Sequence, residues 1–318
     1  MPHCIAAVEP DKALAAHGKG LKLIGEKSEL FSFESDLATS FDCLCVSPNR
    51  SKFLAVDQAQ KAITVFSTTL ERKKSFKFPK RPISMAFVDE THVLVADKFG
   101  DVYCLDLDTE PSEKFALEPI LGHVSMLLKV LIVGNTIITA DRDEHIKISR
   151  LDAPWVIQGF CLGHTQYVSD LCTVGETLFS GGGDSFVALW NPSTFEEICR
   201  ADIDAYLGLS ECNLIRIVAF DENHALCIVQ DSPVIVKIGR DGSLDRYVLP
   251  DQPLDISVAN GKVWVALSSS VLITDLKVTE AFPHDFGDSD VKALLRHELR
   301  KRPDNLADSR HEAPTNDA

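Results

Sequence analysis

A hairpin-like segment recurs seven times along this chain of 318 residues. Each copy has two apolar or β-branched runs around a short polar turn, as in LAVDQAQKAITVF at 54–66 and LFSGGGDSFVALW at 178–190. The copies begin at residues 14, 54, 93, 137, 178, 226 and 263, so the successive spacings are 40, 39, 44, 41, 48 and 37 residues. Such runs around Gly, Asp and Ser turns indicate strands rather than helices. A unit that repeats about every 40 residues buries its core by stacking against its neighbours.

Two neighbouring copies, Thr136–Ser149 and Thr177–Trp190, are written in nearly the same residues, and a Gly-His pair precedes each. This is the signature of a WD-type β-propeller blade. A buried carboxylate needs donors, which imidazole and hydroxyl groups supply. We therefore expect a side-chain network in the second copy, formed by His164, Ser180, Asp184 and Trp190. The matching positions of the first copy are His123, Thr139, Asp143 and Ser149, and because serine replaces tryptophan we expect that network to be incomplete.

The predicted fold is all-β, a seven-bladed WD-repeat β-propeller over residues 1–283. Since an open ring would leave unpaired strand edges, we expect a strand near Leu30–Glu34 or Val278–Phe282 to complete a blade across the two chain ends. A C-terminal extension at 284–303 contains a predicted short helix, Asp290–Arg302, and 304–318 is a polar tail expected to be disordered. A further strand is expected before each hairpin, at Cys4–Val8, Phe41–Val46, Ile83–Val88, Val124–Val130, Val168–Val174, Ile215–Phe220 and Leu254–Val258.

Composition and motifs argue against several classes of function. The chain has 32 basic and 47 acidic residues, a net charge of −15, so contact with nucleic acid requires a local basic patch or a partner. The nine cysteines include no CxxC pair, no apolar run is long enough to span a membrane, and we expect a soluble, intracellular protein with reduced thiols and no metal site. No GxSxG, HExxH or P-loop motif is found. The Gly181–Gly183 cluster is expected at a hairpin turn, where glycine supplies positive φ.

Two local features exceed what a propeller needs. The stretch ADRDEHIK at 140–147 places Asp141, Arg142, Glu144 and Lys147 around one turn. It is either a solvated turn with weak local ion pairs or a charged docking surface. The second feature is a positive island that comprises Arg72, Lys73, Lys74, Lys77, Lys80 and Arg81, interleaved with Phe76 and Phe78. It is either a solubilising outer strand whose phenylalanines point inward or a phosphate contact.

The segments around the fourth hairpin resemble one family, the WD-repeat non-catalytic subunit of the eukaryotic tRNA guanine-N7 methyltransferase. The resemblance rests on GHVSMLL at 122–128, TADRDEHI at 139–146 and FCLGHTQYVS at 160–169, and more weakly on Lys80-Arg81-Pro82. These segments cover about a quarter of the chain.

The resemblance implies a non-catalytic scaffold without a cofactor of its own. Such a subunit binds and stabilises a separate S-adenosylmethionine-dependent catalytic subunit as a heterodimer, meets tRNA mainly through that complex, and has no membrane partner. Carried over, Arg142 and Lys147 become candidate partner contacts oriented by Asp141 and Glu144, and Lys80 and Arg81 become weaker candidates for partner or tRNA-backbone contact. The nucleus is the expected location, with the cytoplasm as a second one.

Two rival functions stay open from the sequence. One is a generic WD-repeat adaptor of a ubiquitin-ligase or chromatin complex, which would bind a peptide through the propeller channel. The other is a propeller enzyme, which would need carboxylates or metal-ligating histidines that converge in the channel.

Overall fold

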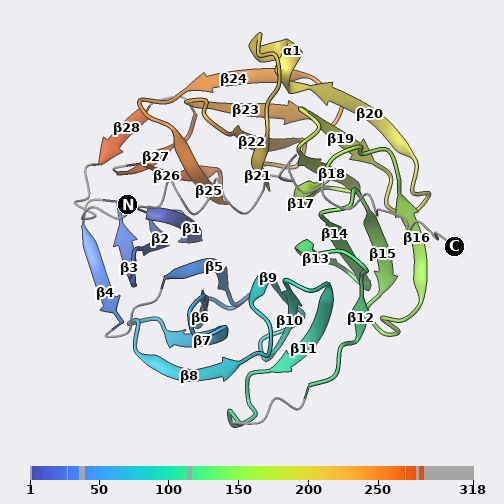
Figure 1. Ribbon diagram of the computed structural model, residues 1–318. Coiled ribbons are helices and arrows are strands. Elements are labelled where there is room, and N and C mark those ends of the chain that lie inside the picture. The colour runs from blue at the N-terminus through green and yellow to red at the C-terminus, as the bar shows by residue number, and fades with distance from the viewer. Residues whose placement is uncertain are drawn as a thin grey trace, which may run out of the picture.

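Seven four-stranded antiparallel sheets form a closed ring in the computed structural model, which describes residues 2–26, 28–35, 40–112, 117–268, 270–276 and 279–282 (Figure 1). The first strand of each sheet lies nearest the central axis and the fourth forms the outer rim. The seven-bladed propeller predicted from the hairpin repeat is therefore confirmed. The predicted C-terminal helix at Asp290–Arg302 and the tail at 304–318 lie outside the described residues.

The four blades of the N-terminal half are β1 to β16. Their bounds are β1 Pro2–Glu9, β2 Lys12–His17, β3 Gly20–Gly25 and β4 Glu29–Glu34; β5 Phe41–Val46, β6 Lys52–Asp57, β7 Ala62–Ser67 and β8 Arg72–Lys77; β9 Pro82–Phe87, β10 His92–Asp97, β11 Asp101–Asp106 and β12 Leu121–Gly122; and β13 Leu127–Val133, β14 Thr136–Asp141, β15 Ile146–Arg150 and β16 Ile157–Cys161.

The remaining three blades contain β17 to β28 and one short helix. Their bounds are β17 Val168–Val174, β18 Thr177–Gly182, β19 Phe186–Trp190 and β20 Glu197–Asp202; α1 Ile203–Leu207; β21 Leu214–Ala219, β22 His224–Val229, β23 Val234–Gly239 and β24 Leu244–Val248; and β25 Pro253–Ala259, β26 Lys262–Leu267, β27 Val271–Thr274 and β28 Thr279–Phe282. Helix α1 lies in the connection between the fifth and sixth blades and accounts for the longest spacing in the repeat.

The inner strands follow the predicted positions closely, with one exception. Strands β5 and β17 have the predicted bounds, whereas β13 begins at Leu127 rather than Val124. The three residues before it form the connection between blades, where the backbone N–H of Arg142 donates to the carbonyl of Met126 at 2.9 Å. This bond lies directly beyond the last strand pair, Leu127 and Asp141, and no described residue before Met126 pairs with β14.

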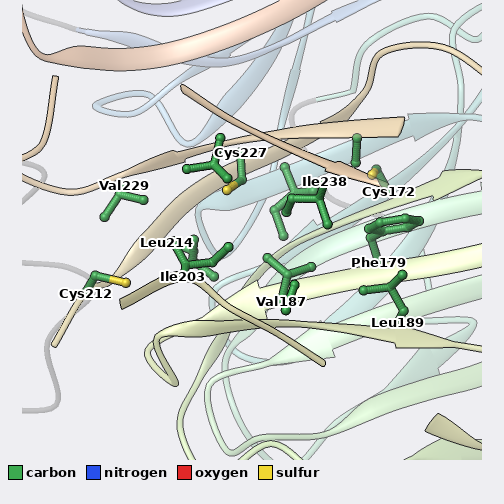
Figure 2. Close-up of a cluster of buried hydrophobic side chains, with 14 of the residues drawn as sticks. Cys172, Phe179, Val187, Leu189, Ile203, Cys212, Leu214, Cys227, Val229 and Ile238 are labelled. Carbon is green, nitrogen blue, oxygen red and sulfur yellow. The ribbon is translucent and has the colours of Figure 1, made fainter. Parts of the chain in front are cut away.

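The apolar core consists of side chains packed between adjacent blades. Figure 2 shows the cluster between the fifth and sixth blades, where Phe179, Val187 and Leu189 face Leu214 and Cys227. Both faces of each middle strand are covered, so β14, β18 and β22 are buried along nearly their whole length. Burial on both sides explains why these hairpins read as continuous apolar runs.

The ring closes without exchange of a strand between the chain ends. Strands β1 to β4 form the first blade and β25 to β28 form the seventh, each from consecutive segments. The expectation that a strand near Leu30–Glu34 or Val278–Phe282 completes a blade across the ends is therefore wrong. Apolar packing closes the seam instead, because Ile5 and Ile24 of the first blade meet Trp264 and Val271 of the seventh.

Candidate functional site

The turn between β14 and β15 carries the charged residues singled out in the sequence. Asp141 ends β14, and its Oδ1 accepts hydrogen bonds from the backbone N–H groups of Asp143 and His145, both at 2.9 Å. Glu144 adopts a φ of 78°, which lets the chain reverse. The turn is thus built on an aspartate side chain, a common device for shaping turns. Arg142, Asp143 and His145 are left exposed at its tip.

A buried histidine fixes this turn to the blade behind it. His123 lies in the connection before β13, and its Nδ1 donates to Oδ2 of Asp141 at 2.9 Å while its Nε2 accepts from the Thr139 hydroxyl at 2.7 Å. Asp143 was the predicted partner of His123, and that prediction is wrong. The carboxylate at the end of the strand points inward toward the imidazole, whereas Asp143, two residues later, lies on the exposed tip of the turn.

Burial and hydrogen bonding set the protonation of this pair. Burial lowers the pKa of His123, and the hydrogen bond to Asp141 only partly offsets that effect. Burial alone would raise the pKa of Asp141, but hydrogen bonds from His123 and from the backbone N–H of His145 outweigh it, so this pKa lies below its usual value. The pair therefore combines a neutral imidazole with an ionised carboxylate near neutral pH.

The second network forms as predicted. His164 Nδ1 donates to Asp184 Oδ2 at 2.7 Å, and the Ser180 hydroxyl donates to His164 Nε2 at 2.7 Å. The indole N–H of Trp190 donates to the same hydroxyl at 2.7 Å. Each polar side chain of this network has a hydrogen-bond partner, as buried polar atoms require. The network connects the blade connection, both strands of the hairpin and its turn.

The first network lacks the indole, as expected. The Ser149 hydroxyl occupies the position of Trp190, and it is buried without a hydrogen-bond partner among the described residues.

The glycine cluster beside Asp184 has a different role from the one predicted. Positive φ occurs at Ser185 (63°), and glycine is required at Gly182 because a Cβ there would lie 1.8 Å from the Tyr167 carbonyl oxygen.

The structure divides the four predicted partner contacts. Arg142 is exposed and Glu144 is half-buried, but Asp141 is only 2% exposed and holds the turn together. Lys147 is 9% exposed, and its Nζ donates to the carbonyl of Gly122 on the outer strand of the third blade. Burial lowers the pKa of this ammonium, and nearby Asp141 partly counters the effect. Arg142 is therefore the accessible cation of this group, whereas Lys147 connects the fourth blade to the third through its hydrogen bond to Gly122.

The basic island also separates into distinct environments. Phe76 and Phe78 are buried, as expected for an outer strand whose aromatic residues point inward. Lys80 is exposed, and its Nζ lies 3.9 Å from the ring centroid of Phe99. Arg81 is half-buried, and its carbonyl accepts from the backbone N–H of Lys98 at 2.9 Å.

Exposed apolar side chains along the rim of the fourth blade were missed in the sequence. Trp155, Ile157, Phe160 and Leu162 lie on or beside outer strand β16, and Val124 is fully exposed in the connection that precedes β13. Phe160 is the cross-strand neighbour of Lys147. Single exposed apolar residues are ordinary, but a strip of them beside a charged turn is typical of an interaction surface. The run of apolar and aromatic residues from Trp155 to Leu162, on a strand expected to be exposed, was the sequence signal that could have indicated this surface.

The described residues contain no metal-ligating cluster. No group of three or more His, Cys, Asp or Glu side chains within them could hold a metal ion. All nine cysteines lie in the described part of the chain, and none forms a disulfide. The single described helix, α1, has five residues, and nothing helical in the described ranges has the length and apolar character of a membrane span.

Comparison with known proteins identifies the family. A model of the "tRNA methyltransferase TRM82 WD40 domain" matches residues 15–114 and 108–269, which is most of the chain. The chain belongs to the TRM82 WD40 domain family. The resemblance noted in the sequence is thereby confirmed.

Relatives of this TRM82-family chain include two from fungi, both named tRNA (guanine-N(7)-)-methyltransferase non-catalytic subunit TRM82. The protein from Eremothecium gossypii is 44% identical over 163 residues, which cover 47% of this chain and 36% of the relative. The one from Saccharomyces cerevisiae is 37% identical over 177 residues, which cover 52% of this chain and 40% of the relative. The chain thus spans about two fifths of the length of these relatives.

Solved structures confirm the fold of this TRM82-family chain. The Myceliophteria thermophila Cps50 (Swd1) β-propeller domain aligns with a TM-score of 0.73 at 10% identity, over 86% of this chain and 95% of that domain. A chain of the Mitotic Checkpoint Complex aligns with a TM-score of 0.71 at 10% identity, over 89% and 87% of the two chains. At such low identity these matches carry the architecture alone.

Proposed function

We propose that this chain is the non-catalytic subunit of a tRNA guanine-N7 methyltransferase. In this role it binds and stabilises the S-adenosylmethionine-dependent catalytic subunit as a heterodimer, which forms N7-methylguanine in the tRNA variable loop. The observation that carries the proposal is the family match, together with relatives that are named non-catalytic subunits of that enzyme. The proposal includes contact with tRNA mainly through the complex and residence in the nucleus, with the cytoplasm as a second location.

The docking surface in this proposal is formed by the β14–β15 turn and the adjacent outer strand β16 of the fourth blade. Arg142 is exposed there on a turn that the buried His123–Asp141 pair holds rigid. A cation on a rigid turn pairs with an acidic partner at a small entropic cost. The neighbouring apolar side chains of Phe160 and Leu162 supply area that a partner can bury. This combination of a charged turn and an apolar strip fits a protein partner better than a small ligand.

Ion pairs within the channel argue against the generic adaptor as the primary function. Lys129 Nζ lies 2.6 Å from Oδ1 of Asp170, and Arg216 Nε lies 3.2 Å from Oδ1 of Asp255. These charged side chains come from consecutive inner strands and neutralise one another across blades. A channel that reads a charged peptide would instead present such groups to its ligand.

Reconstitution of the enzyme tests this proposal. The catalytic subunit from the same organism is purified alone and as a co-expressed complex with this chain, and N7-methylguanine is measured in tRNA by mass spectrometry. We expect this chain to co-purify with the catalytic subunit and to raise methylation, and we expect no activity from this chain alone. A catalytic subunit that does not associate with this chain, or that works equally well without it, would contradict the proposal.

A further inference from the structure

The face of the propeller that carries the hairpin turns is divided by charge. This turn face consists of the turns between the second and third strands of each blade and of the connections between blades. Over the first three blades it presents five exposed lysines. They are Lys19, Lys61, Lys77, Lys80 and Lys98.

The other side of the turn face has the opposite charge. In the fifth to seventh blades the described turns and connections contain no Lys or Arg, and they carry several acidic residues. These are Asp184, Asp202, Asp204, Glu211, Asp231 and Asp251. In a chain with a net charge of −15, a cluster of exposed lysines is a marked local reversal. Such segregation steers a polyanion to one side of the disc.

Four of these lysines form one continuous patch. Lys77 pairs across β7 and β8 with Ala62, which follows Lys61, and the backbone N–H of Phe78 donates to the Lys61 carbonyl at 2.8 Å. Lys80 follows two residues later, and the Arg81–Lys98 backbone hydrogen bond joins it to the turn of the third blade. We name Lys61, Lys77, Lys80, Lys98 and Phe99 the basic patch.

The lysines of the basic patch differ from their neighbours in the same island. Lys73 pairs with Glu71 at 2.6 Å, and Lys74 pairs with Glu110 at 3.1 Å and also donates to three backbone carbonyls. For the four lysines of the basic patch, by contrast, no ion pair forms within the described residues. Their charge is available to a ligand, whereas that of Lys73 and Lys74 is already used.

Phe99 gives the basic patch a second recognition element. Its side chain is 61% exposed at the tip of the turn between β10 and β11, and the Lys80 ammonium lies over its ring. Proteins that bind single-stranded nucleic acid combine lysine or arginine side chains for the phosphates with exposed rings for the bases. An acidic peptide would use the lysines but has no need of the ring. The combination therefore favours RNA over an acidic protein.

The position of the basic patch connects it to the proposed docking surface. The backbone N–H of His123 donates to the Gly100 carbonyl at 2.8 Å, directly after Phe99, and the Met126 carbonyl accepts from Arg142. The basic patch and the Arg142 turn therefore lie on adjacent blades of one face. A catalytic subunit docked at the fourth blade would hold its RNA substrate beside the third.

We propose that the basic patch binds the sugar-phosphate backbone of the RNA substrate while the catalytic subunit acts on it, with Phe99 stacking on an unpaired base. This inference rests on the proposed function and extends it, because it gives the propeller a direct share in RNA binding. Each phosphate contact releases counterions, so the contribution of the basic patch must weaken as salt concentration rises.

The test uses the intact two-subunit complex and tRNA. Three versions of this chain are compared: wild type, a variant with Lys61→Ala, Lys77→Ala, Lys80→Ala and Lys98→Ala, and the control Lys73→Ala from the same island. Complex formation is measured first, by size-exclusion chromatography, and then the Kd for tRNA and the KM for methylation are measured at several salt concentrations. Phe99→Ala is measured in parallel.

We expect the quadruple variant to form the complex normally and to bind tRNA about tenfold or more weakly at low salt. Its slope of log Kd against log salt should fall by roughly three units, since each lost phosphate contact is worth about 0.7 to 0.9. KM should rise while kcat stays unchanged, Phe99→Ala should weaken binding severalfold without a change in the slope, and Lys73→Ala should behave as wild type.

Two results would overturn the inference while leaving the proposed function in place. The first is an intact quadruple-variant complex with unchanged tRNA affinity and an unchanged salt slope. The second is a quadruple variant that loses the catalytic subunit, which would show that the basic patch is a protein-docking surface. A wild-type chain that does not associate with the catalytic subunit would instead contradict the proposed function, and this inference with it.

Discussion

The backbone N–H of Ile5 donates to Oδ2 of Asp255 at 2.8 Å, and this bond joins the first blade to the seventh. The other carboxylate oxygen of Asp255 faces Arg216 Nε at 3.2 Å, and Arg216 also lies 3.5 Å from Asp170. The seam between the chain ends thus combines this polar contact of the inner strands with apolar packing, and no strand is shared across it.

Replacement of Asp255 with alanine should weaken this seam. The substitution removes the acceptor of Ile5 and leaves Arg216 with a single carboxylate, so we expect a loss of roughly 3 to 5 kcal/mol in the free energy of unfolding. Urea denaturation followed by tryptophan fluorescence measures it. Asp11→Ala, an exposed carboxylate in the first blade, should change stability by less than about 0.5 kcal/mol. Equal stabilities for the two variants would show that the seam does not need Asp255.

The two hairpin networks predict opposite effects for two serine-to-alanine substitutions. Ser180→Ala removes a hydroxyl that bonds both His164 and Trp190, and should cost about 1 to 3 kcal/mol. Ser149→Ala removes a buried hydroxyl without a partner in the described structure, and should be neutral or stabilising by up to about 1 kcal/mol. The difference in thermal unfolding temperature between the variants checks both. A large loss of stability in Ser149→Ala would mean that its hydroxyl is bonded.

The Asp184 carboxylate should give the fold an acid-sensitive component. Burial alone would raise the pKa of Asp184, but hydrogen bonds from His164 and Thr165 outweigh it and lower the pKa to about 2. Because the folded pKa is depressed, this stabilisation is present above about pH 4 and is lost as the pH falls toward 2. The stability difference between wild type and Asp184→Asn should therefore shrink by roughly 2 kcal/mol between pH 4 and 2. A difference that does not vary with pH would contradict this pKa shift.

Lys147 should behave as a structural residue. Its buried ammonium bonds the Gly122 carbonyl, so Lys147→Ala should lower the free energy of unfolding by roughly 1 to 3 kcal/mol. Arg142→Ala, at the exposed tip of the same hairpin, should change it by less than about 0.5 kcal/mol. Chemical denaturation of both variants makes the comparison. Similar losses in the two would place Arg142 inside the blade rather than on its surface.

The hairpins were predictable from sequence because strand signals are local. Alternating or continuous apolar runs and Gly, Asp or Ser turns located all seven hairpins, and the His164–Ser180–Trp190 network followed from residue types at matching positions. The type of closure was not predictable, because hydrogen bonds between β1 and β25 join segments 250 residues apart and leave no local pattern.

Two side chains at the candidate site illustrate what residue spacing cannot decide. Alignment of the two turns matched Asp143 with Asp184, which bonds His164. In the first copy, however, His123 is bonded by Asp141, two residues before Asp143. A carboxylate at the end of the strand and one in the turn can both reach the imidazole, so spacing alone does not decide between them. Lys147 appeared to be available because it is charged. Strand β15 is covered on both faces by neighbouring blades, so the alternation of side chains along the strand leaves neither face exposed, and Lys147 is buried.

The affinity between this chain and the catalytic methyltransferase subunit tests the central claim most directly. The Kd is measured with purified subunits by isothermal titration calorimetry, for wild type and for Arg142→Glu. We expect tight binding by wild type, at least tenfold weaker binding by Arg142→Glu because the substitution reverses the charge of the proposed contact, and equal thermal stability of both forms. Wild-type affinity in Arg142→Glu would contradict docking through the β14–β15 turn of the fourth blade.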